Sequence, residues 1–206
     1  EECQNEVLTC GLMRVGIREV HEEYNYKNFF KILRAKLQHE QFDGTMSAEV
    51  ERLVFERGNS VGVLLYDADE DTVFLTRQFR YPAYIHDGPG WIIEIVAGMQ
   101  DQARDMMTVA HSELVEEIGY QVDHLQFLCH FYLSPGGSSE RMNVYLGHLH
   151  HARRVNEGGG LKSEHEDIQL ISISLPHALE MIRQGEICDA KTIIALQQLY
   201  ILRANG

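Results

Sequence analysis

The sequence of 206 residues is short of positive charge, with 18 Lys and Arg against 31 Asp and Glu and a formal net charge of −13. A general binder of nucleic acid or of an anionic membrane surface needs a basic surplus to neutralise phosphate groups, so the composition argues against both partners. A substrate that carries phosphate would need local help from Arg, Lys or a metal ion.

Long apolar runs and cysteine pairs are also missing. No apolar stretch approaches the length of about 20 residues that a membrane-spanning helix needs, and the acidic N-terminal stretch lacks the apolar core of a signal peptide. No CxxC pair occurs among Cys3, Cys10, Cys129 and Cys188, which argues against a disulfide framework or a zinc ribbon. We therefore expect a cytoplasmic protein. The sequence starts at Glu1 rather than Met, which leaves open whether a targeting segment precedes it.

The remaining composition is typical of one globular domain with a small appendage. Hydrophobic residues make up 44% of the chain and charged residues 24%, which excludes wholesale disorder. At roughly 100–200 residues per domain, the length supports a single main domain. The sequence contains no internal repeat and no low-complexity stretch.

Apolar alternation and turn signals predict more strands than helices. Two extended segments are expected between Phe29 and Phe55, joined through Asp43-Gly44, a hairpin signal. The other expected strands are Ser60–Tyr66, Thr72–Gln78, Trp91–Gly98, Leu125–Tyr132, Met142–His148 and Ile168–Ile173. The expected helices are Met106–Ile118, Leu175–Gln184 and Ala190–Leu202. Because the helices come late and the strands outnumber them, we expect an α+β fold with a mixed sheet.

The helix predicted at residues 106–118 has clear signals at both ends. Asp105 suits the N-cap and Gly119 the position after the C-terminus. Ala110, Leu114 and Ile118 recur every four residues and predict the stripe that faces the core. By the same reasoning, Asp189 is expected to cap the last helix.

Three carboxylates share one face of this helix. Glu113, Glu116 and Glu117 stand at positions i, i+3 and i+4, where like charges repel by roughly 0.2–0.5 kcal/mol per pair. They also crowd the last turn, where the helix dipole disfavours anions. One interpretation is a solvated acidic face. The other is a site for a hard cation such as Mg²⁺ or Mn²⁺, which carboxylate oxygens suit.

The stretch from Gly98 to Tyr120 resembles the Nudix box, G-x5-E-x7-R-E-U-x-E-E-x-G-U, where U is a bulky apolar residue. Tyr120 is an accepted variant at the end, and the residues that match at the required spacing are Gly98, Glu113, Leu114, Glu116, Glu117 and Gly119. Arg104 replaces the first Glu of the box and Ser112 replaces its Arg. In the family these two positions brace the loop and the helix, so the resemblance implies an intact catalytic end with an altered brace. Asp105 could partly substitute for that brace.

Further motifs extend the resemblance over about residues 54–202. RGN at 57–59, RQFR at 77–80 and EIVAG at 94–98 resemble the ADP-ribose and nucleotide-sugar branch of the family. The GDP-mannose pyrophosphatase group is the most similar, through SPGGSSE at 134–140, GGGLKSEHEDI at 158–168 and GEICDAKT at 185–192. The resemblance implies a Nudix α/β/α sandwich with a mixed sheet over residues 58–206. A small N-terminal antiparallel β region, residues 1–57, would contribute to dimerisation and substrate binding.

The resemblance also implies a reaction. Enzymes of this branch hydrolyse the diphosphate of a nucleoside diphosphate sugar, of the GDP-mannose or ADP-ribose type, to a nucleoside monophosphate and a sugar phosphate. The implied cofactor is Mg²⁺, with Mn²⁺ as a substitute. By resemblance the metal ligands are Glu113, Glu117 and the backbone carbonyl of Ala97, with Glu116 as a further ligand or support.

Other site residues follow from the motifs outside the box. In the loop at 158–168, with Gly158–Gly160 as a possible hinge, we assign Glu166 to the metal and Glu164 to the general base, although the two could exchange roles. The expected substrate contacts are Arg80, Glu140, Lys191 and, more weakly, Arg52. Lys191 stands in the first turn of a helix, where the dipole disfavours cations, which indicates an anion nearby. Glu94, among apolar neighbours, calls for a partner that the sequence does not identify.

The sequence also raises two alternative interpretations of its motifs and predicts an oligomeric state. Arg104 and Ser112 motivate a degenerate Nudix module that binds or senses a nucleotide sugar without cleaving it, although the three retained glutamates favour the enzyme. A zinc site at His148, His150 and His151, the first two on one strand face, is disfavoured because no Cys or carboxylate stands at ligand spacing. We expect a homodimer formed through the N-terminal strands, which would otherwise leave an unprotected sheet edge.

Overall fold

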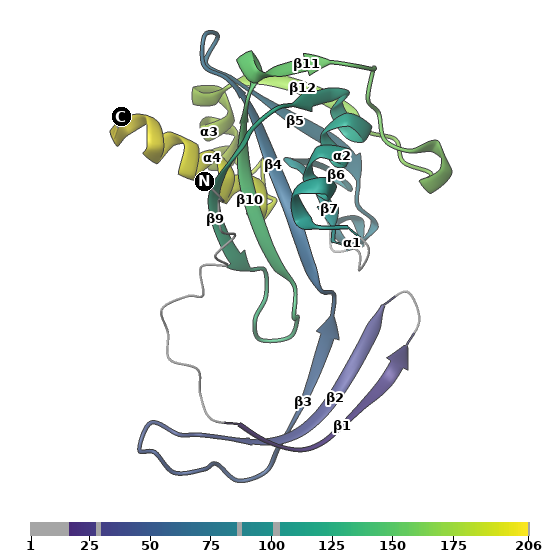
Figure 1. Cartoon of the computed structure of the whole chain (residues 1–206), viewed down its shortest axis with the longest axis vertical. Coiled ribbons are helices and arrows are strands. Elements are labelled where there is room, and N and C mark those ends of the chain that lie inside the picture. The colour runs from purple at the N-terminus through teal and green to yellow at the C-terminus, as the bar shows by residue number, and fades with distance from the viewer. Residues whose placement is uncertain (1–16, 28–29, 86–87, 101–103, 206) are drawn as a thin grey trace, which may run out of the picture. The chain divides into compact units, whose positions relative to one another are not determined.

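The computed structural model describes residues 17–27, 30–85, 88–100 and 104–205 (Figure 1). The chain divides into two compact units, residues 1–56 and 57–206. Among the described helices, none combines the length and the apolar character that crossing a membrane requires. Cys129 and Cys188 carry free thiols, whereas Cys3, Cys10 and the start of the predicted hairpin at Phe29 lie outside the described residues.

The first unit is a three-stranded antiparallel sheet of β1 (Ile17–Lys27), β2 (Lys31–His39) and β3 (Val50–Glu56). The predicted hairpin through Asp43-Gly44 is confirmed: the Thr45 amide donates to Asp43 Oδ1 at 2.9 Å, and Gly44 has φ +82°. Strand β1 was not predicted. Its pairing with β2 contains two register irregularities, and these interrupt the period of two by which a strand is recognised.

The second unit is built on a seven-stranded mixed sheet. Its main path runs β12–β5–β4–β10–β9, in which β4 and β10 are parallel and the other neighbours antiparallel. These strands are β4 (Asn59–Asp67), β5 (Thr72–Phe79), β9 (Leu125–Tyr132), β10 (Arg141–His148) and β12 (Gln169–Ser174). A separate short pair, β8 (Tyr120–Val122) with β11 (Ala152–Arg154), was not predicted because three residues are too few to show a period.

The stretch predicted as one strand from Trp91 to Gly98 is two strands. The first, β6 (Trp91–Glu94), pairs with β5, and the second, β7 (Val96–Met99), pairs with β4. The chain crosses from one partner to the other at Ile95, whose backbone N–H donates to Thr192 Oγ1 at 2.8 Å. This crossing places Ala97 and Gly98 beside β4.

The main helices are α2 (Met106–Ile118), α3 (Leu175–Gln184) and α4 (Ala190–Asn205). The predicted caps are confirmed: Asp105 Oδ1 accepts from the Thr108 amide at 2.9 Å, Gly119 has φ +77°, and Asp189 Oδ2 accepts from the Thr192 amide at 3.0 Å. Three shorter pieces are α1 (Tyr81–Tyr84), η1 (Leu149–His151) and η2 (Lys162–Glu164). Because β10 ends at His148 and His150 lies in η1, the expectation that both share a strand face is wrong.

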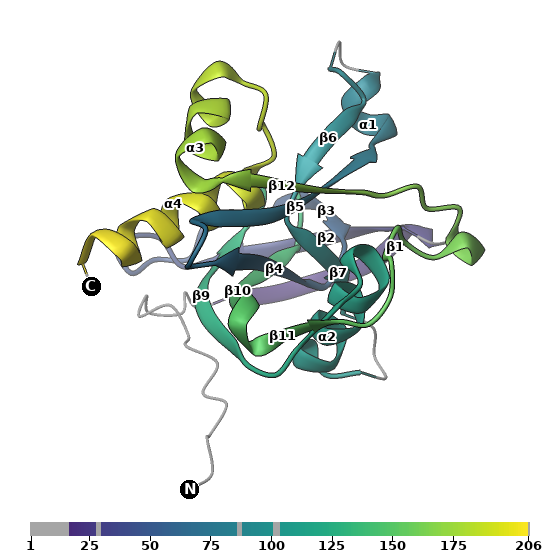
Figure 2. The ribbon, with the colours of Figure 1, turned by 90° about the horizontal axis from the view of Figure 1, so that it is seen from above.

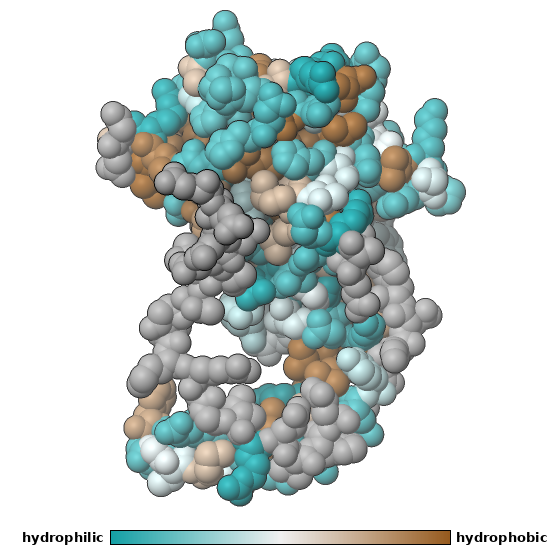
Figure 3. All heavy atoms as spheres, in the orientation of Figure 1, coloured by the Kyte–Doolittle hydropathy of each residue, from teal (hydrophilic) through white to brown (hydrophobic). Residues whose placement is uncertain are grey.

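Helices cover both faces of the large sheet. Figures 1 and 2 show α2 on one face and α3 with α4 on the other. Ala110, Leu114 and Ile118 are fully buried beneath α2, as predicted, and a second core lies between the sheet and α3 and α4. Hydrophilic residues prevail on the visible face of this unit (Figure 3). The predicted α+β fold, an α/β/α sandwich with a mixed sheet and a small N-terminal antiparallel sheet, is confirmed.

Candidate active site

The carboxylates of α2 lie in very different surroundings. Glu117 is only 3% exposed, and its Oε2 has no hydrogen-bond partner among the described residues. Burial, together with the charges of Glu113 and Glu166, raises the pKa of the Glu117 carboxyl well above its usual value. Because a buried carboxylate is costly without a partner, this oxygen calls for a proton or a cation.

Glu113 lies against the backbone of β7. A Cβ added to Gly98 would stand 2.1 Å from Glu113 Oε1, so the glycine leaves the space that this carboxylate fills, next to Ala97. Burial and the charges of Glu116 and Glu166 raise the pKa of Glu113 to about 7, while Arg104 opposes the rise. Arg104, which replaces the first Glu of the box, therefore acts electrostatically on Glu113.

The loop that follows β11 brings further carboxylates to α2. Both Glu166 and Glu164 contribute to the raised pKa of Glu113, so their charges lie near that side chain. Glu166 is half-buried, and its Oε2 accepts from the Leu161 amide at 2.9 Å. Glu164 ends η2 and is exposed. The charges of both predicted loop carboxylates thus act on one of the box glutamates, Glu113.

Two of three consecutive glycines hydrogen-bond this loop to the C-terminal end of α2. The Gly159 amide donates to the Glu117 carbonyl at 2.9 Å, and the Gly160 amide donates to the Glu116 carbonyl at 3.0 Å. Gly158, Gly159 and Gly160 have φ of +70°, +103° and +83°, a backbone region that favours glycine. The stretch predicted as a hinge is therefore hydrogen-bonded to the helix that carries the box.

Replacing Gly158 with Ala should destabilise the protein strongly. The new Cβ would lie 2.6 Å from the Glu117 carbonyl oxygen and 2.7 Å from the Ile118 carbonyl carbon, both backbone atoms. We expect a loss of about 3 kcal/mol, the sum of a left-handed alanine and an overpacked contact. Gly185→Ala is the matched control, since φ is +79° there and no described atom lies within 4 Å of an added Cβ. Equal melting temperatures for the two variants would contradict this role of Gly158.

Two cations meet at a buried carboxylate beside these acids. Arg80 Nε donates to Glu94 Oε2 at 2.7 Å, and Lys191 Nζ donates to Glu94 Oε1 and, at 3.0 Å, to Asp189 Oδ1. The charges of Arg80 and Glu94 both act on the pKa of Glu117, the first lowering it and the second raising it. The position of Lys191 in the first turn of a helix predicted an anion nearby. The structure places two carboxylates of the protein itself there, Glu94 and Asp189.

The remaining predicted residues have other surroundings. Glu140 is half-buried and accepts from Arg57 Nε at 3.2 Å through Oε2. Arg52 belongs to the first unit, where it is exposed on β3 and donates to the Glu51 carbonyl at 2.9 Å. Asp105, the predicted substitute for the altered brace, instead binds Thr108 through both carboxylate oxygens, at 2.9 and 2.7 Å.

The donors around Glu117 fit a hard cation. The described part of the chain contains no group of three or more His, Cys, Asp or Glu side chains already arranged as a metal site. The inference of a cation therefore rests on charge and burial: an unpartnered buried oxygen of Glu117, the raised pKa of Glu113, and the nearby charge of Glu166. Carboxylate and carbonyl oxygens are the ligands that Mg²⁺ and Mn²⁺ prefer.

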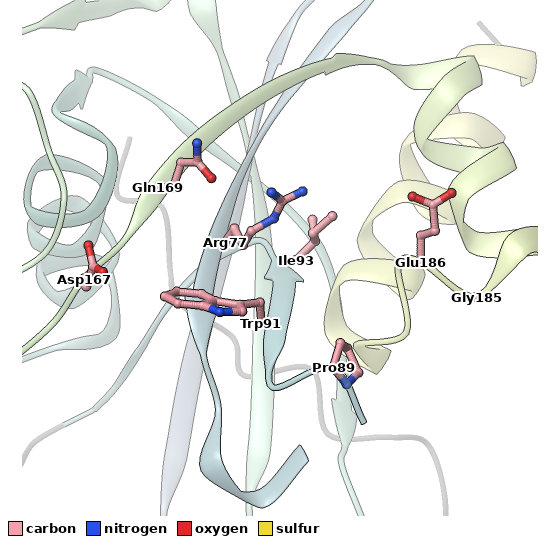
Figure 4. A pocket seen from close by; sticks show the side chains of 8 residues that line it. All are labelled: Arg77, Pro89, Trp91, Ile93, Asp167, Gln169, Gly185 and Glu186. Atoms are coloured by element: carbon pink, nitrogen blue, oxygen red, sulfur yellow. The ribbon is translucent and has the colours of Figure 1, made fainter. Parts of the chain in front are cut away.

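A pocket lies elsewhere on the second unit. It has a volume of about 830 Å³, and Figure 4 shows Arg77 and Trp91 in the middle of its lining, with Asp167 on one side and Glu186 on the other. Its lining comes from β5, β6, the start of β12 and the connection between α3 and α4, and contains none of the predicted site residues. Its charged residues are one arginine and two acids. We therefore prefer the carboxylates of α2 as the candidate active site.

Comparison with known proteins agrees with the sequence motifs. A model of the NUDIX domain matches residues 56–193. The chain is 35% identical over 182 residues to an ADP-ribose pyrophosphatase of Escherichia coli strain K12, covering 88% of this chain and 87% of that protein. It is 33% identical over 190 residues to a GDP-mannose pyrophosphatase of Cronobacter sakazakii, covering 92% and 97%. The crystal structure of an ADP compounds hydrolase shares the fold, with a TM-score of 0.67 and 19% identity over 96% of this chain and 99% of that chain.

Proposed function

Because the chain belongs to the Nudix family of hydrolases and is a Nudix pyrophosphatase, we propose that its substrate is a nucleoside diphosphate sugar of the GDP-mannose or ADP-ribose type. Water attacks one phosphorus, the P–O–P anhydride bond breaks, and the products are a nucleoside monophosphate and a sugar phosphate. The observation that carries this proposal is the buried carboxylate oxygen of Glu117, which has no hydrogen-bond partner among the described residues and lies within the part of the chain that the NUDIX domain model matches.

The proposed metal site uses oxygen atoms from α2, β7 and the loop after β11. Glu113, Glu117 and the Ala97 carbonyl would hold Mg²⁺ or Mn²⁺, with Glu166 from the loop and Glu116 as a further ligand or support. When bound, the cation supplies Lewis-acid compensation for diphosphate charge and activation of water. The protein would position the loop carboxylates through the glycine hydrogen bonds to the Glu116 and Glu117 carbonyls.

Proton transfer is assigned to the same loop. Glu164 is exposed at the end of η2 and would accept the proton of the attacking water, with Glu166 on the metal. The two glutamates could exchange these roles. Arg80 is the proposed phosphate contact, and Arg52 and Glu140 are further proposed substrate contacts. The Lys191 side chain, the fourth residue predicted from the sequence, is 9% exposed and bound to Glu94 and Asp189, so we propose that it serves the substrate through Glu94.

A panel of nucleotide sugars with Mg²⁺ tests the proposed function. We expect ADP-ribose, GDP-mannose or both to yield a nucleoside monophosphate and a sugar phosphate, resolved by chromatography. Running the reaction in ¹⁸O-water identifies the attacked phosphorus, because the label enters the product that contains it. The alternative, a module that binds without cleaving, is motivated by Arg104 and Ser112 at the altered brace. Calorimetric binding without product after prolonged incubation would favour that alternative.

A homodimer is the proposed assembly. Within residues 30–56, Ala35 is the only buried hydrophobic residue, while Phe42 and Leu53 are fully and half exposed. Such a sheet gains little stability from its own core, so we expect it to pack against a second copy. One chain has a mass of 23.6 kDa. Light scattering coupled to gel filtration at micromolar concentration should give twice that mass. A single-chain mass would contradict the proposal.

A further inference from the structure

Glu94 uses both carboxylate oxygens on two different cations. Oε2 accepts from Arg80 Nε at 2.7 Å, and Oε1 accepts from Lys191 Nζ. The Glu94 side chain is 5% exposed and that of Lys191 9%, whereas that of Arg80 is 43% exposed. The buried Glu94 carboxylate therefore bridges the partly exposed Arg80 and the buried Lys191.

A ring of hydrogen bonds holds this carboxylate in place. Lys191 Nζ also donates to Asp189 Oδ1 at 3.0 Å, and Asp189 Oδ2 accepts from the Thr192 amide at 3.0 Å and from the Thr192 hydroxyl at 2.6 Å. The same hydroxyl accepts from the Ile95 amide at 2.8 Å, and Ile95 follows Glu94 in the chain. The ring thus fixes the crossing between β6 and β7 to the N-terminus of α4. Networks whose members are all satisfied are rigid.

The geometry also decides which part of Arg80 is committed. A guanidinium group is planar and donates from Nε and from two terminal amino groups. Because Nε is the atom bound to Glu94, the plane of the group is held while its terminal nitrogens are not used by that contact. Phosphate groups are commonly bound by such paired terminal donors.

We infer that Glu94 is a positioning residue, which orients the Arg80 guanidinium through Nε so that its terminal amino groups meet the substrate diphosphate. Lys191 pairs with the other oxygen of Glu94 and offsets its negative charge. The positive charge of Arg80 is therefore not cancelled by Glu94 and can attract the substrate. This inference rests on the proposed function for its substrate. The contact between Glu94 and Arg80 can be tested in the absence of substrate.

A double-mutant cycle tests the inference on turnover. Arg80→Ala, Glu94→Gln and the double variant are compared with the wild type, using ADP-ribose and GDP-mannose with Mg²⁺. We expect Arg80→Ala to lower kcat/KM about 100-fold and Glu94→Gln about 10-fold, the scale of a misplaced reacting group. In the Arg80→Ala background, Glu94→Gln should change kcat/KM by less than about 2-fold. An undiminished 10-fold loss in that background would overturn the inference, because Glu94 would then act independently of Arg80.

The exchange of the Arg80 Nε proton with solvent provides the second measurement. Its ¹⁵N-correlated signal is assigned by its absence in Arg80→Lys and followed without substrate. We expect slow exchange in the wild type and at least about 10-fold faster exchange in Glu94→Gln, because the hydrogen bond that protects the proton is weakened. The Arg57 Nε proton, bound to Glu140, is the internal control and should not change. Equal exchange in the two proteins would overturn the inference. If the wild type cleaves neither nucleotide sugar, the proposed function fails while this measurement still decides the role of Glu94.

Discussion

Replacing Glu117 with Gln should abolish hydrolysis while making the metal-free protein more stable. The side chain is only 3% exposed and one of its oxygens has no partner among the described residues, so the metal-free folded chain must either hold a proton there or bear a buried charge that nothing compensates. Gln keeps the shape and removes the charge. We expect turnover to fall by more than about 100-fold, since residues that merely support a metal ligand already cost 10–100-fold. The free energy of unfolding at pH 8 should rise by about 1 kcal/mol.

Both effects are measured on the same preparation. Initial rates of nucleotide-sugar hydrolysis in Mg²⁺ report turnover, and thermal unfolding in a chelator reports stability. Glu180→Gln is the control: it removes a carboxylate that pairs with Arg183 at 2.9 Å on the surface of α3, and it should leave turnover unchanged. Wild-type rates in Glu117→Gln would contradict the assignment of α2 to the active site. A loss of rate together with a loss of stability would indicate that Glu117 serves the fold instead.

Elements with local signals could be predicted from the sequence to the residue. Helix α2 begins and ends as expected because Asp105 and Gly119 act within one turn of the chain. The split of residues 91–99 could not be predicted, because it depends on pairing with two strands, β5 and β4, that come earlier in the sequence. Strand β1 was missed because irregular pairing disrupts its period.

The same division applies to the candidate site. The spacing of Glu113, Glu116 and Glu117 is a local pattern, so the sequence was enough to group them. One of the two partners of Glu94 is Lys191, 97 positions away, and only the folded sheet and α4 bring them together. The glycine tract was visible in the sequence. Its hydrogen bonds to the carbonyls of Glu116 and Glu117 were not, because they depend on tertiary contact.

The metal-free protein should lose stability as the pH rises from about 5 to about 8. Glu113 has a folded-state pKa of about 7, above its usual 4.5, and the pKa of Glu117 is also raised. As the pH rises past 4.5, the unfolded chain releases these protons first, while the folded chain keeps them until its own pKa is reached. The stabilisation is therefore complete below pH 4.5 and is lost through pH 7, a loss of about 3 kcal/mol from Glu113 alone.

This loss should appear as a fall of about 6–12 °C in melting temperature between pH 5 and pH 8 in a chelator. His148 opposes it, because burial lowers the pKa of its imidazole and so favours folding at higher pH. The comparison is therefore made against Glu113→Gln, in which the His148 contribution is unchanged and the pH dependence due to Glu113 is absent. A wild type whose melting temperature follows that of the variant at every pH would contradict the burial of charge at Glu113.

Adding Mg²⁺ should reverse the fall most strongly at high pH. Protons and the cation compete for the same carboxylates, so at pH 5 the metal must displace protons that the folded state holds tightly, whereas at pH 8 it meets ionised groups. A ligand that binds only the folded state stabilises it by RT ln(1 + [L]/Kd), and the apparent Kd for Mg²⁺ should therefore be lower at pH 8. The rise in melting temperature at a fixed Mg²⁺ concentration should be several-fold larger at pH 8 than at pH 5, and should shrink in Glu117→Gln at both. An equal rise at the two pH values would mean that the cation binds somewhere other than Glu113 and Glu117.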